Sequence, residues 1–223
     1  SGHYYIAGED VAKFNAAERA TLRNKRIGFV FQNFNLLSRT TALENVMMPA
    51  VYAHPALSMK AMRERSVELL NLVGLSDRMD HTPAQLSGGQ QQRVAIARSL
   101  INNPSILLAD EPTGNLDSTT SKEVLHMFKD LNRQQGITVI LVSHSMEDVA
   151  RYVDRIIVMN KGEKMLDSTP KEVFRHYKEL EEVGLAAPQV TYVMHDLKDR
   201  GFDVSPDATT IEEAADEIMR SFI

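Results

Sequence analysis

The chain has 223 residues, of which 43% are hydrophobic, and this combination excludes a disordered chain while allowing one large core or a core with a small attached subdomain. Its formal net charge is −5 without a dense run of Lys and Arg, so no nucleic-acid partner is expected, and the lack of cysteine excludes disulfides and thiolate metal sites. No stretch approaches the roughly 18 apolar residues that cross a membrane, so we expect a soluble chain.

The first part of the chain predicts two short strands, at residues 4–6 and 26–31, and the second strand ends at the polar Gln32. A mainly helical region follows from about residue 42 to residue 102. Within it, apolar residues at helical spacing predict a helix that ends near Gly74, which is placed like a C-cap. The predicted buried stripe of this helix consists of Met59, Met62, Ser66, Leu69, Leu70 and Val73.

Two buried strands are predicted next, at residues 105–109 and 137–142, separated by a helix that Thr120 and Glu123 are expected to cap. Strand, helix and strand at this spacing indicate a right-handed parallel crossover. A hairpin is expected over residues 155–166, and helices after it. The residues expected to be buried on the crossover helix are Val124, Leu125, Phe128 and Leu131. A later helix is expected to carry Val190, Val193, Met194 and Leu197 on one face, and the last helix is expected to carry Ile211, Ala214, Ala215 and Ile218.

The most specific motif of the chain is the run Leu86, Ser87, Gly88, Gly89 and Gln90. It fits the S-x-x-Q capping box, which predicts that a helix begins there, with Val94, Ala97 and Ile101 as its buried stripe. A capped helix start with two glycines can also bind phosphate, because its backbone N–H groups are free, the helix dipole is positive there and no side chain blocks approach. The alternative is that Ser87 and Gln90 only cap a helix.

Two carboxylates, Asp110 and Glu111, end the apolar strand at residues 106–109. Phosphoryl transfer to water needs a cation near the β and γ phosphates and a group that orients or deprotonates the water. Asp110 suits the Mg²⁺ shell and Glu111, one residue further out, suits the water. His144 follows the next strand, where parallel sheets place their sites. The alternatives are an ordinary loop carboxylate pair, a hydrogen-bonded loop histidine and, for Gln32, a surface amide.

The order of these motifs resembles the ABC ATPase family over nearly the whole chain. By that match Gln32 is the Q-loop residue, with a catalytic and a metal-binding role, and Asp110 and Glu111 are the Walker B pair. Asp117 lies in the D-loop and His144 is the switch histidine that senses the γ-phosphate. Ser87, Gly88, Gly89 and Gln90 form the signature, which in the family contacts ATP held mainly by a second subunit in a head-to-tail dimer. The implied cofactors are ATP and Mg²⁺.

The resemblance implies an α/β fold, a P-loop NTPase (RecA-like) parallel-sheet core that lacks its N-terminal part, with an inserted helical subdomain and a C-terminal helical extension. The expected division is an N-terminal core remnant at 1–32, a helical signature subdomain at 33–102, a core part at 103–168 and the extension at 169–223. The first half resembles ATPases of lipoprotein-release and macrolide-export systems. The C-terminal part is similar to ATPases of energy-coupling-factor importers.

One departure from the family concerns the phosphate loop, G-x-x-x-x-G-K-[ST], which precedes the Q-loop in the family and occurs nowhere in these 223 residues. The chain also begins without Met, so we expect a cut N-terminus and a fragment that is inactive alone. The family implies an ATPase at the cytoplasmic face of the cell membrane, peripheral through a permease subunit. The alternatives are a soluble ABC ATPase of DNA repair or translation and a non-catalytic fragment.

Overall fold

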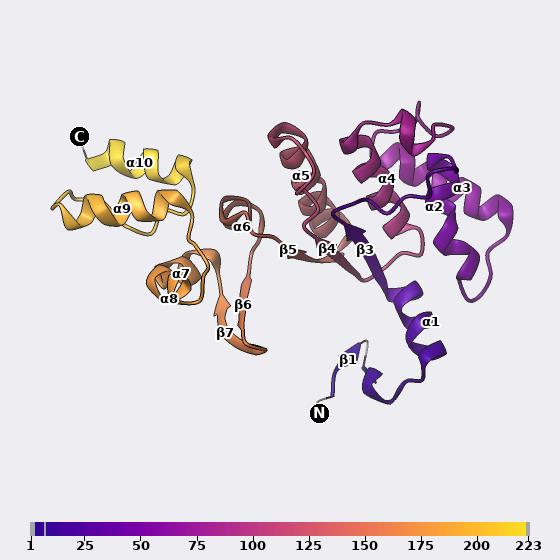
Figure 1. The fold of residues 1–223 in the computed structure, drawn as a ribbon, viewed down its shortest axis with the longest axis horizontal. Helices are drawn as coiled ribbons and strands as arrows, with labels where there is room; N and C mark the ends of the chain where they lie inside the picture. Colours follow the sequence, from indigo (N-terminus) through magenta and orange to yellow (C-terminus); the bar gives the residue numbers. More distant parts are fainter. Residues whose placement is uncertain (1–2, 7, 222–223) are drawn as a thin grey trace. The chain divides into compact units, whose positions relative to one another are not determined.

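The computed structural model describes residues 3–6 and 8–221, which divide into two units, Ser1–Val142 and Ser143–Ile223 (Figure 1). The expected four-part division stays a prediction. Among the described residues, no helix is both long enough and apolar enough to cross a bilayer.

A three-stranded parallel sheet forms the centre of the first unit. Its strands are β3 (Ile27–Phe31), β4 (Ile106–Asp110) and β5 (Thr138–Val142), with β4 in the middle. In the register of the sheet, Phe31 pairs with Asp110 and Asp110 pairs with Val142. The three strands therefore end together, and the loops that follow them leave the same edge of the sheet, which confirms the predicted parallel crossover.

The prediction of a fully buried strand at residues 137–142 is wrong for three of its side chains. Thr138 is exposed, Ile140 is 48% exposed and Val142 is 54% exposed. These residues alternate with the half-buried Val139 and Leu141, so they share one face of the sheet, and within the described residues that face is uncovered at β5. Leu107 and Ala109 of the central strand are buried, as expected for a strand with neighbours on both sides.

Helices of the signature region pack against one face of this sheet and against one another. They are α2 (Ala42–Met47), η2 (Met48–Tyr52), α3 (Met59–Leu72), η3 (Pro83–Gln85) and α4 (Gly88–Leu100). The predicted stripe of α3 is confirmed from Met62 to Val73, but Met59 is 67% exposed because it begins the helix, beyond the packed turns. Gly74 has a φ of +73°, which agrees with its predicted place at the helix end.

Helix α5 (Ser118–Gln135) connects β4 to β5 and begins earlier than predicted. Its N-cap is Asp117, whose carboxylate accepts hydrogen bonds from the backbone N–H groups of Thr119 and Thr120, so the expected caps Thr120 and Glu123 lie inside the helix. Asp is as good an N-cap as Thr, and here it comes first in the chain. All four side chains predicted to be buried on this helix are buried: Val124, Leu125, Phe128 and Leu131.

The N-terminal segment contains a helix that the sequence reasoning did not predict, α1 (Ala16–Arg26), which begins with a capping box between Asn15 and Glu18. Before it lie β1 (Tyr5–Ile6), β2 (Glu9–Asp10) and η1 (Val11–Lys13). No residue of α1 is buried, and the lack of an apolar stripe is why periodicity did not find this helix.

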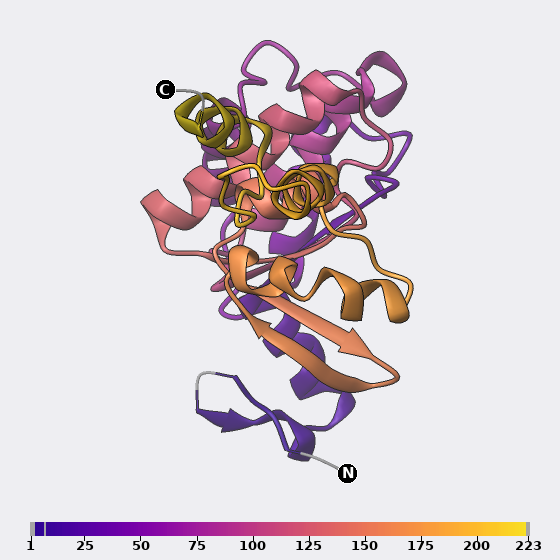
Figure 2. The same ribbon diagram turned by 90° about the vertical axis from the view of Figure 1, so that its left-hand side faces the viewer.

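The second unit consists of α6 (Met146–Tyr152), the antiparallel hairpin of β6 (Ile156–Asn160) and β7 (Glu163–Ser168), α7 (Pro170–Arg175), α8 (Tyr177–Glu182), α9 (Gln189–Asp199) and α10 (Ile211–Ser221). Figure 2 shows the predicted hairpin as two paired arrows. One apolar cluster joins α6, the hairpin, α7 and α8, and a separate cluster lies between α9 and α10. Among the apolar residues that the sequence places on these two helices, Val193 and Ile211 are 53% and 72% exposed. They face away from this thin two-helix layer, where Met194 and Ala214 form the core.

Candidate functional site

The loops that follow β3 and β4 carry three of the candidate residues. Gln32 follows the last residue of β3, Asp110 ends β4, and Glu111 comes next. Because Phe31 and Asp110 are partners in the register, Gln32 and the two carboxylates leave the sheet at the same edge. Gln32 and Asp110 are exposed, so their polar atoms are accessible to a ligand at this edge.

A second contact ties the loop after Gln32 to the loop after Glu111. A Cβ atom on Gly114 would lie 2.6 Å from Nε2 of Gln32, so the side chain of Gln32 packs directly over this glycine. The side-chain amide of Asn115 donates to the carbonyl oxygen of Gln32 at 3.0 Å and to Oδ1 of Asn33 at 2.9 Å. The structure therefore brings Gln32 together with the segment that follows the two carboxylates.

The backbone of Glu111 has a conformation that residues other than glycine rarely adopt. Its φ is +45°, and its N–H donates to the carbonyl oxygen of Val142 at 3.0 Å, at the end of β5. Backbone strain of this kind persists only where the surroundings enforce it, and it is common at functional sites. The positive φ of Glu111 turns the chain sharply where the three strands end.

The N-terminus of α4 forms the third part of the site. Ser87 is the N-cap: its Oγ accepts from the N–H of Gln90 at 3.3 Å, and Oε1 of Gln90 accepts from the N–H of Ser87 at 3.0 Å, so the predicted capping box is confirmed. The N–H groups of Gly88 and Gly89 belong to the first turn, which has no acceptor within the helix. Ser87 itself is exposed.

This helix start lies against the beginning of α5. A Cβ atom on Gly89 would come within 2.4 Å of Cγ2 of Thr120, and one on Gly88 would lie 3.7 Å from Leu116. Thr120 is held in place because its hydroxyl donates to Oδ2 of Asp117 at 2.6 Å. That hydrogen bond, together with those from the N–H groups of Thr120 and Thr119, holds the pKa of Asp117 below its usual value. Asp117 thus acts as a helix cap in this chain.

Two polar side chains that sequence reasoning missed connect α4 to the other loops. The amide of Gln92, which is fully buried, donates to the carbonyl oxygen of Pro112 at 2.6 Å. The guanidinium of Arg98 donates to the carbonyl oxygens of Phe34 and Asn35 at 2.8 Å and 2.5 Å. Burial lowers the pKa of Arg98 from its usual value. The sequence marks Gln92 and Arg98 only as polar residues on faces of α4 that also carry apolar residues.

His144 lies in the second unit, in the turn between β5 and α6, and it is exposed. In that turn the hydroxyl of Ser143 accepts from the N–H of Ser145, which caps α6. The structure therefore places His144 after the predicted strand, as expected, and its role stays a prediction.

The oxygen atoms of Asp110, Glu111 and Gln32 at the strand ends are of the kind that binds Mg²⁺ in proteins. Among the described residues, no group of three or more His, Asp or Glu side chains could hold a metal ion by itself. Mg²⁺ is usually bound by one or two carboxylates, with waters and phosphate oxygens completing its shell. Asp110 and the amide oxygen of Gln32 can supply the protein part of such a shell.

Comparison with known proteins agrees with this arrangement. The family model described as "ABC transporter" matches residues 1–114. A macrolide export ATP-binding/permease protein MacB of Syntrophobacter fumaroxidans is 47% identical over 223 residues, covering 100% of this chain and 30% of the relative. The energy-coupling factor transporter ATP-binding protein EcfA2 of Caldanaerobacter subterraneus is 40% identical over 224 residues, covering 98% of this chain and 76% of the relative. Relatives of both expected branches therefore match the chain.

Among solved structures, an ATP-binding cassette captured as a dimer in a post-hydrolysis state with ADP and Pi is 42% identical, with a TM-score of 0.67 over 76% of this chain and 73% of that one. The fold and the order of loops thus define an ATP-binding cassette of the P-loop NTPase class. The chain belongs to the ABC transporter ATP-binding family. It spans less than a third of the length of the macrolide-export relatives, 30% of one and 23% of another.

Proposed function

We propose that this chain is part of the ATP-binding and ATP-hydrolysing subunit of an ABC transporter and energises transport through a partner permease. The observation that carries the proposal is the contact, within one unit, of the Gln32 loop, the loop after Asp110 and Glu111, and the start of α4. An ATPase needs groups for metal, water and phosphate, and these three segments together supply all three kinds.

The proposed roles follow from the chemistry of each group. Asp110 and Gln32 hold Mg²⁺ through oxygen atoms, and Glu111 orients and deprotonates the attacking water. Ser87, Gly88 and Gly89 offer a hydroxyl and the N–H groups of a first helical turn to phosphate oxygens. Gln90 closes the cap that keeps this turn in place, and Asp117 fixes the neighbouring helix start. His144 senses the γ-phosphate.

A second copy and a membrane subunit are the proposed partners. The exposed position of Ser87 allows its helix start to contact a nucleotide held mainly by another subunit in a head-to-tail dimer, and the related cassette was solved as a dimer. The docking surface for the permease is proposed to lie just after Gln32, at Phe34, Leu36, Leu37, Met47, Met48 and Tyr52. Leu37 and Tyr52 are 45% and 66% exposed. Such a subunit is peripheral, at the cytoplasmic face of the membrane.

We propose that the 223 residues are inactive by themselves, which corresponds to the alternative of a non-catalytic fragment. The phosphate loop pattern does not occur in them, so the phosphate contacts reduce to the start of α4. A helix terminus contributes about 0.3 to 1 kcal/mol at exposed sites, whereas micromolar affinity requires about 8 kcal/mol. A phosphate loop supplied by a preceding segment would provide the missing contacts.

Phosphate release tests this function. The chain alone is compared with the chain fused behind a segment that carries the family's G-x-x-x-x-G-K-[ST] phosphate loop. We expect Mg-ATP turnover only from the fusion, and we expect Glu111→Gln in the fusion to abolish turnover while nucleotide binding, followed by titration calorimetry, persists. Near-normal turnover of the Glu111→Gln fusion would refute the role of Glu111, and a folded fusion that binds no nucleotide would refute the function.

A further inference from the structure

The last two helices of the chain are joined to the rest of the second unit by polar contacts and by the start of α9, where Tyr192 packs against the apolar cluster of the preceding elements. Helices α9 and α10 enclose their own apolar cluster, formed by Met194, Val204, Ala208 and Ala214. The other cluster of the unit lies in α6, the β6–β7 hairpin, α7 and α8. The ring of Tyr177 connects the two layers, because it contacts the rings of Tyr192 and His195 at centroid distances of 5.5 Å and 4.7 Å.

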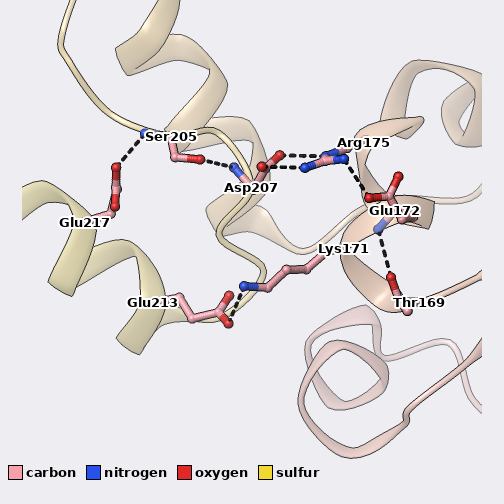
Figure 3. Close-up of polar contacts among 8 residues, drawn as sticks. All are labelled: Thr169, Lys171, Glu172, Arg175, Ser205, Asp207, Glu213 and Glu217. Atoms are coloured by element: carbon pink, nitrogen blue, oxygen red, sulfur yellow. Dashed lines mark hydrogen bonds and ion pairs between the residues drawn. The ribbon is translucent and has the colours of Figure 1, made fainter.

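Among the described residues, three ion pairs cross between these layers. In each pair the cation lies on the layer of α6 and α7, and the carboxylate lies on the α9–α10 layer. Arg175 binds Asp207 through two parallel hydrogen bonds, of 2.8 Å and 2.6 Å, and Lys171 lies 3.0 Å from a carboxylate oxygen of Glu213. Figure 3 shows these two pairs, with both cations on α7, Asp207 on the segment that leads into α10 and Glu213 in the first turn of α10. The third pair joins Arg151 of α6 to Glu212. Every cation therefore lies on α6 or α7, and every carboxylate lies in residues 207–213.

Hydrogen bonds within the α9–α10 layer hold its acidic segment, residues 207–213, in one conformation. The N–H of Thr209 donates to Glu213 at 3.0 Å, and the N–H of Ser205 donates to Glu217 at 2.8 Å. The hydroxyl of Ser205 in turn accepts from the N–H of Asp207 (Figure 3). These bonds fix residues 205–213 on α10, so the α9–α10 layer can move as one body with its carboxylates in place.

Part of the boundary between the two layers is hollow. A hollow of about 540 Å³ lies there, lined by charged and threonine side chains of α6, α7 and residues 209–213. The pKa of Asp207 is held below its usual value by the hydrogen bonds from Arg175. Exposed ion pairs like these are individually weak and are weakened further by salt, although a bidentate arginine in a network is the strongest form.

We propose that the α9–α10 layer is held by an ionic latch, made of Arg151, Lys171 and Arg175 on one side and Asp207, Glu212 and Glu213 on the other, which raised ionic strength opens. Opening separates the acidic segment from α7 while the contact of Tyr177 with Tyr192 keeps the base of α9 attached. The latch thus gives the second unit two arrangements, closed and open, and the surrounding salt sets their ratio.

A distance measurement on the full chain tests the latch. The chain has no cysteine, so cysteines introduced at Glu163 of β7 and Ala215 of α10 are unique sites for spin labels. Both positions are exposed. As the salt concentration rises from about 0.1 M to about 1 M, the Debye length falls from about 10 Å to about 3 Å. We expect one narrow distance distribution at the lower salt and a second, longer population at the higher salt.

Two substitutions separate the latch from unrelated effects. Asp207→Asn removes the carboxylate that Arg175 binds across the boundary, and we expect the longer population to appear already at about 0.1 M salt. Glu172→Gln is the matched control, because Glu172 pairs with the same arginine at 2.6 Å but lies on the same helix, and we expect it to behave like the unsubstituted latch. Circular dichroism checks that each variant is folded. If Asp207→Asn unfolds the unit, the salt series of the labelled parent decides: a single narrow distribution up to about 1 M salt overturns the proposal.

Discussion

Gln92 and Gly89 show how single residues of α4 keep the loops of the site in place. Gln92 holds the carbonyl oxygen of Pro112, one residue after Glu111, and Gly89 lets the helix start lie against Thr120. Gln92 has no proposed chemical role, and the proposed role of Gly89 belongs to its N–H group and not to its contact with Thr120. Both contacts set where the groups with proposed roles lie, so their loss should alter stability and geometry together.

Gln92→Leu is expected to destabilise the first unit by about 1 kcal/mol, because the carbonyl oxygen of Pro112 loses its donor in a buried place. The destabilisation is expected near the low end of the range for a buried polar group without a partner. The reason is that Oε1 of Gln92, which has no hydrogen-bond partner among the described residues, is removed as well. Urea unfolding followed by circular dichroism measures the change. Gln135→Leu, at the exposed end of α5, is the control and should change stability by less than about 0.5 kcal/mol. Equal effects of the two substitutions would contradict the interpretation.

Gly89→Ala is expected to cost about 1 to 3 kcal/mol, because the new methyl group overlaps Cγ2 of Thr120 and the hydroxyl bond to Asp117 stops that side chain from rotating away. Thr120→Ser removes the methyl group and keeps the hydroxyl. The double variant Gly89→Ala with Thr120→Ser should therefore recover most of the loss in thermal unfolding. Without such recovery, the contact with Thr120 is not what requires glycine at this position.

At the scale of elements, α4 is the helix that links the site. Its start carries the signature residues, Gln92 reaches the loop after β4, and Arg98 near its end binds two carbonyl oxygens of the loop after β3. A shift of α4 must therefore move both loops. The surface proposed for the permease begins at Phe34, and Arg98 binds the carbonyl oxygen of this residue. A displacement of that surface is therefore expected to move α4 through Arg98.

Charge substitution at Leu36 and Leu37 tests this surface. The double variant Leu36→Glu with Leu37→Glu is expected to uncouple ATP hydrolysis from transport in a reconstituted transporter, because an apolar contact with the permease becomes a charged one. Its melting temperature should stay close to that of the parent, since Leu37 is 45% exposed. Leu43→Glu, at a position that is only 3% exposed, should by contrast unfold the chain. Loss of cooperative folding in the double variant would favour the alternative that these residues form a small core.

At the scale of the whole molecule, paired carboxylates gather in the second unit. Arg155 and Lys164 hold the pKa of Asp167 well below its usual range, and Arg175 does the same for Asp207 to a lesser degree. The pKa of Glu217 is lowered by the N–H of Ser205. In the first unit the corresponding groups are two helix caps, Glu44 and Asp117. Acid should therefore affect the second unit more.

A carboxyl group whose pKa is lower in the folded state stabilises the fold above its ordinary pKa, near 4, and this contribution is lost as the pH falls through the folded value. We expect the second unit to lose stability between about pH 5 and about pH 2. Asp167→Asn should lower the melting temperature at neutral pH and approach the parent in acid. Melting curves across this range measure it, with Asp154→Asn as the control, because Asp154 is exposed and has no ion pair among the described residues. Parallel curves for Asp167→Asn and the parent would contradict the prediction.

Much of the fold could be predicted because its signals are local. The capping box at Ser87 and Gln90, the apolar stripe of α5 and the hairpin of β6 and β7 each depend on residues a few positions apart. Errors arose where a side chain's surroundings depend on distant segments. Ile140 and Val142 have the pattern of a buried strand, and they are exposed because the face of the sheet on which both lie is uncovered at β5 within the described residues.

By itself the sequence determined the order of motifs, and with it the family, because Gln32, the signature, Asp110, Glu111 and His144 are recognised by type and spacing. Only the tertiary structure decided which of them meet. The bond from Asn115 to Gln32 joins residues 83 positions apart, and the bond from Arg98 to Phe34 joins residues 64 apart. The ion pair of Arg175 and Asp207 likewise spans 32 positions. Contacts over such separations arise when packing places whole elements, so no local pattern of the chain contains them.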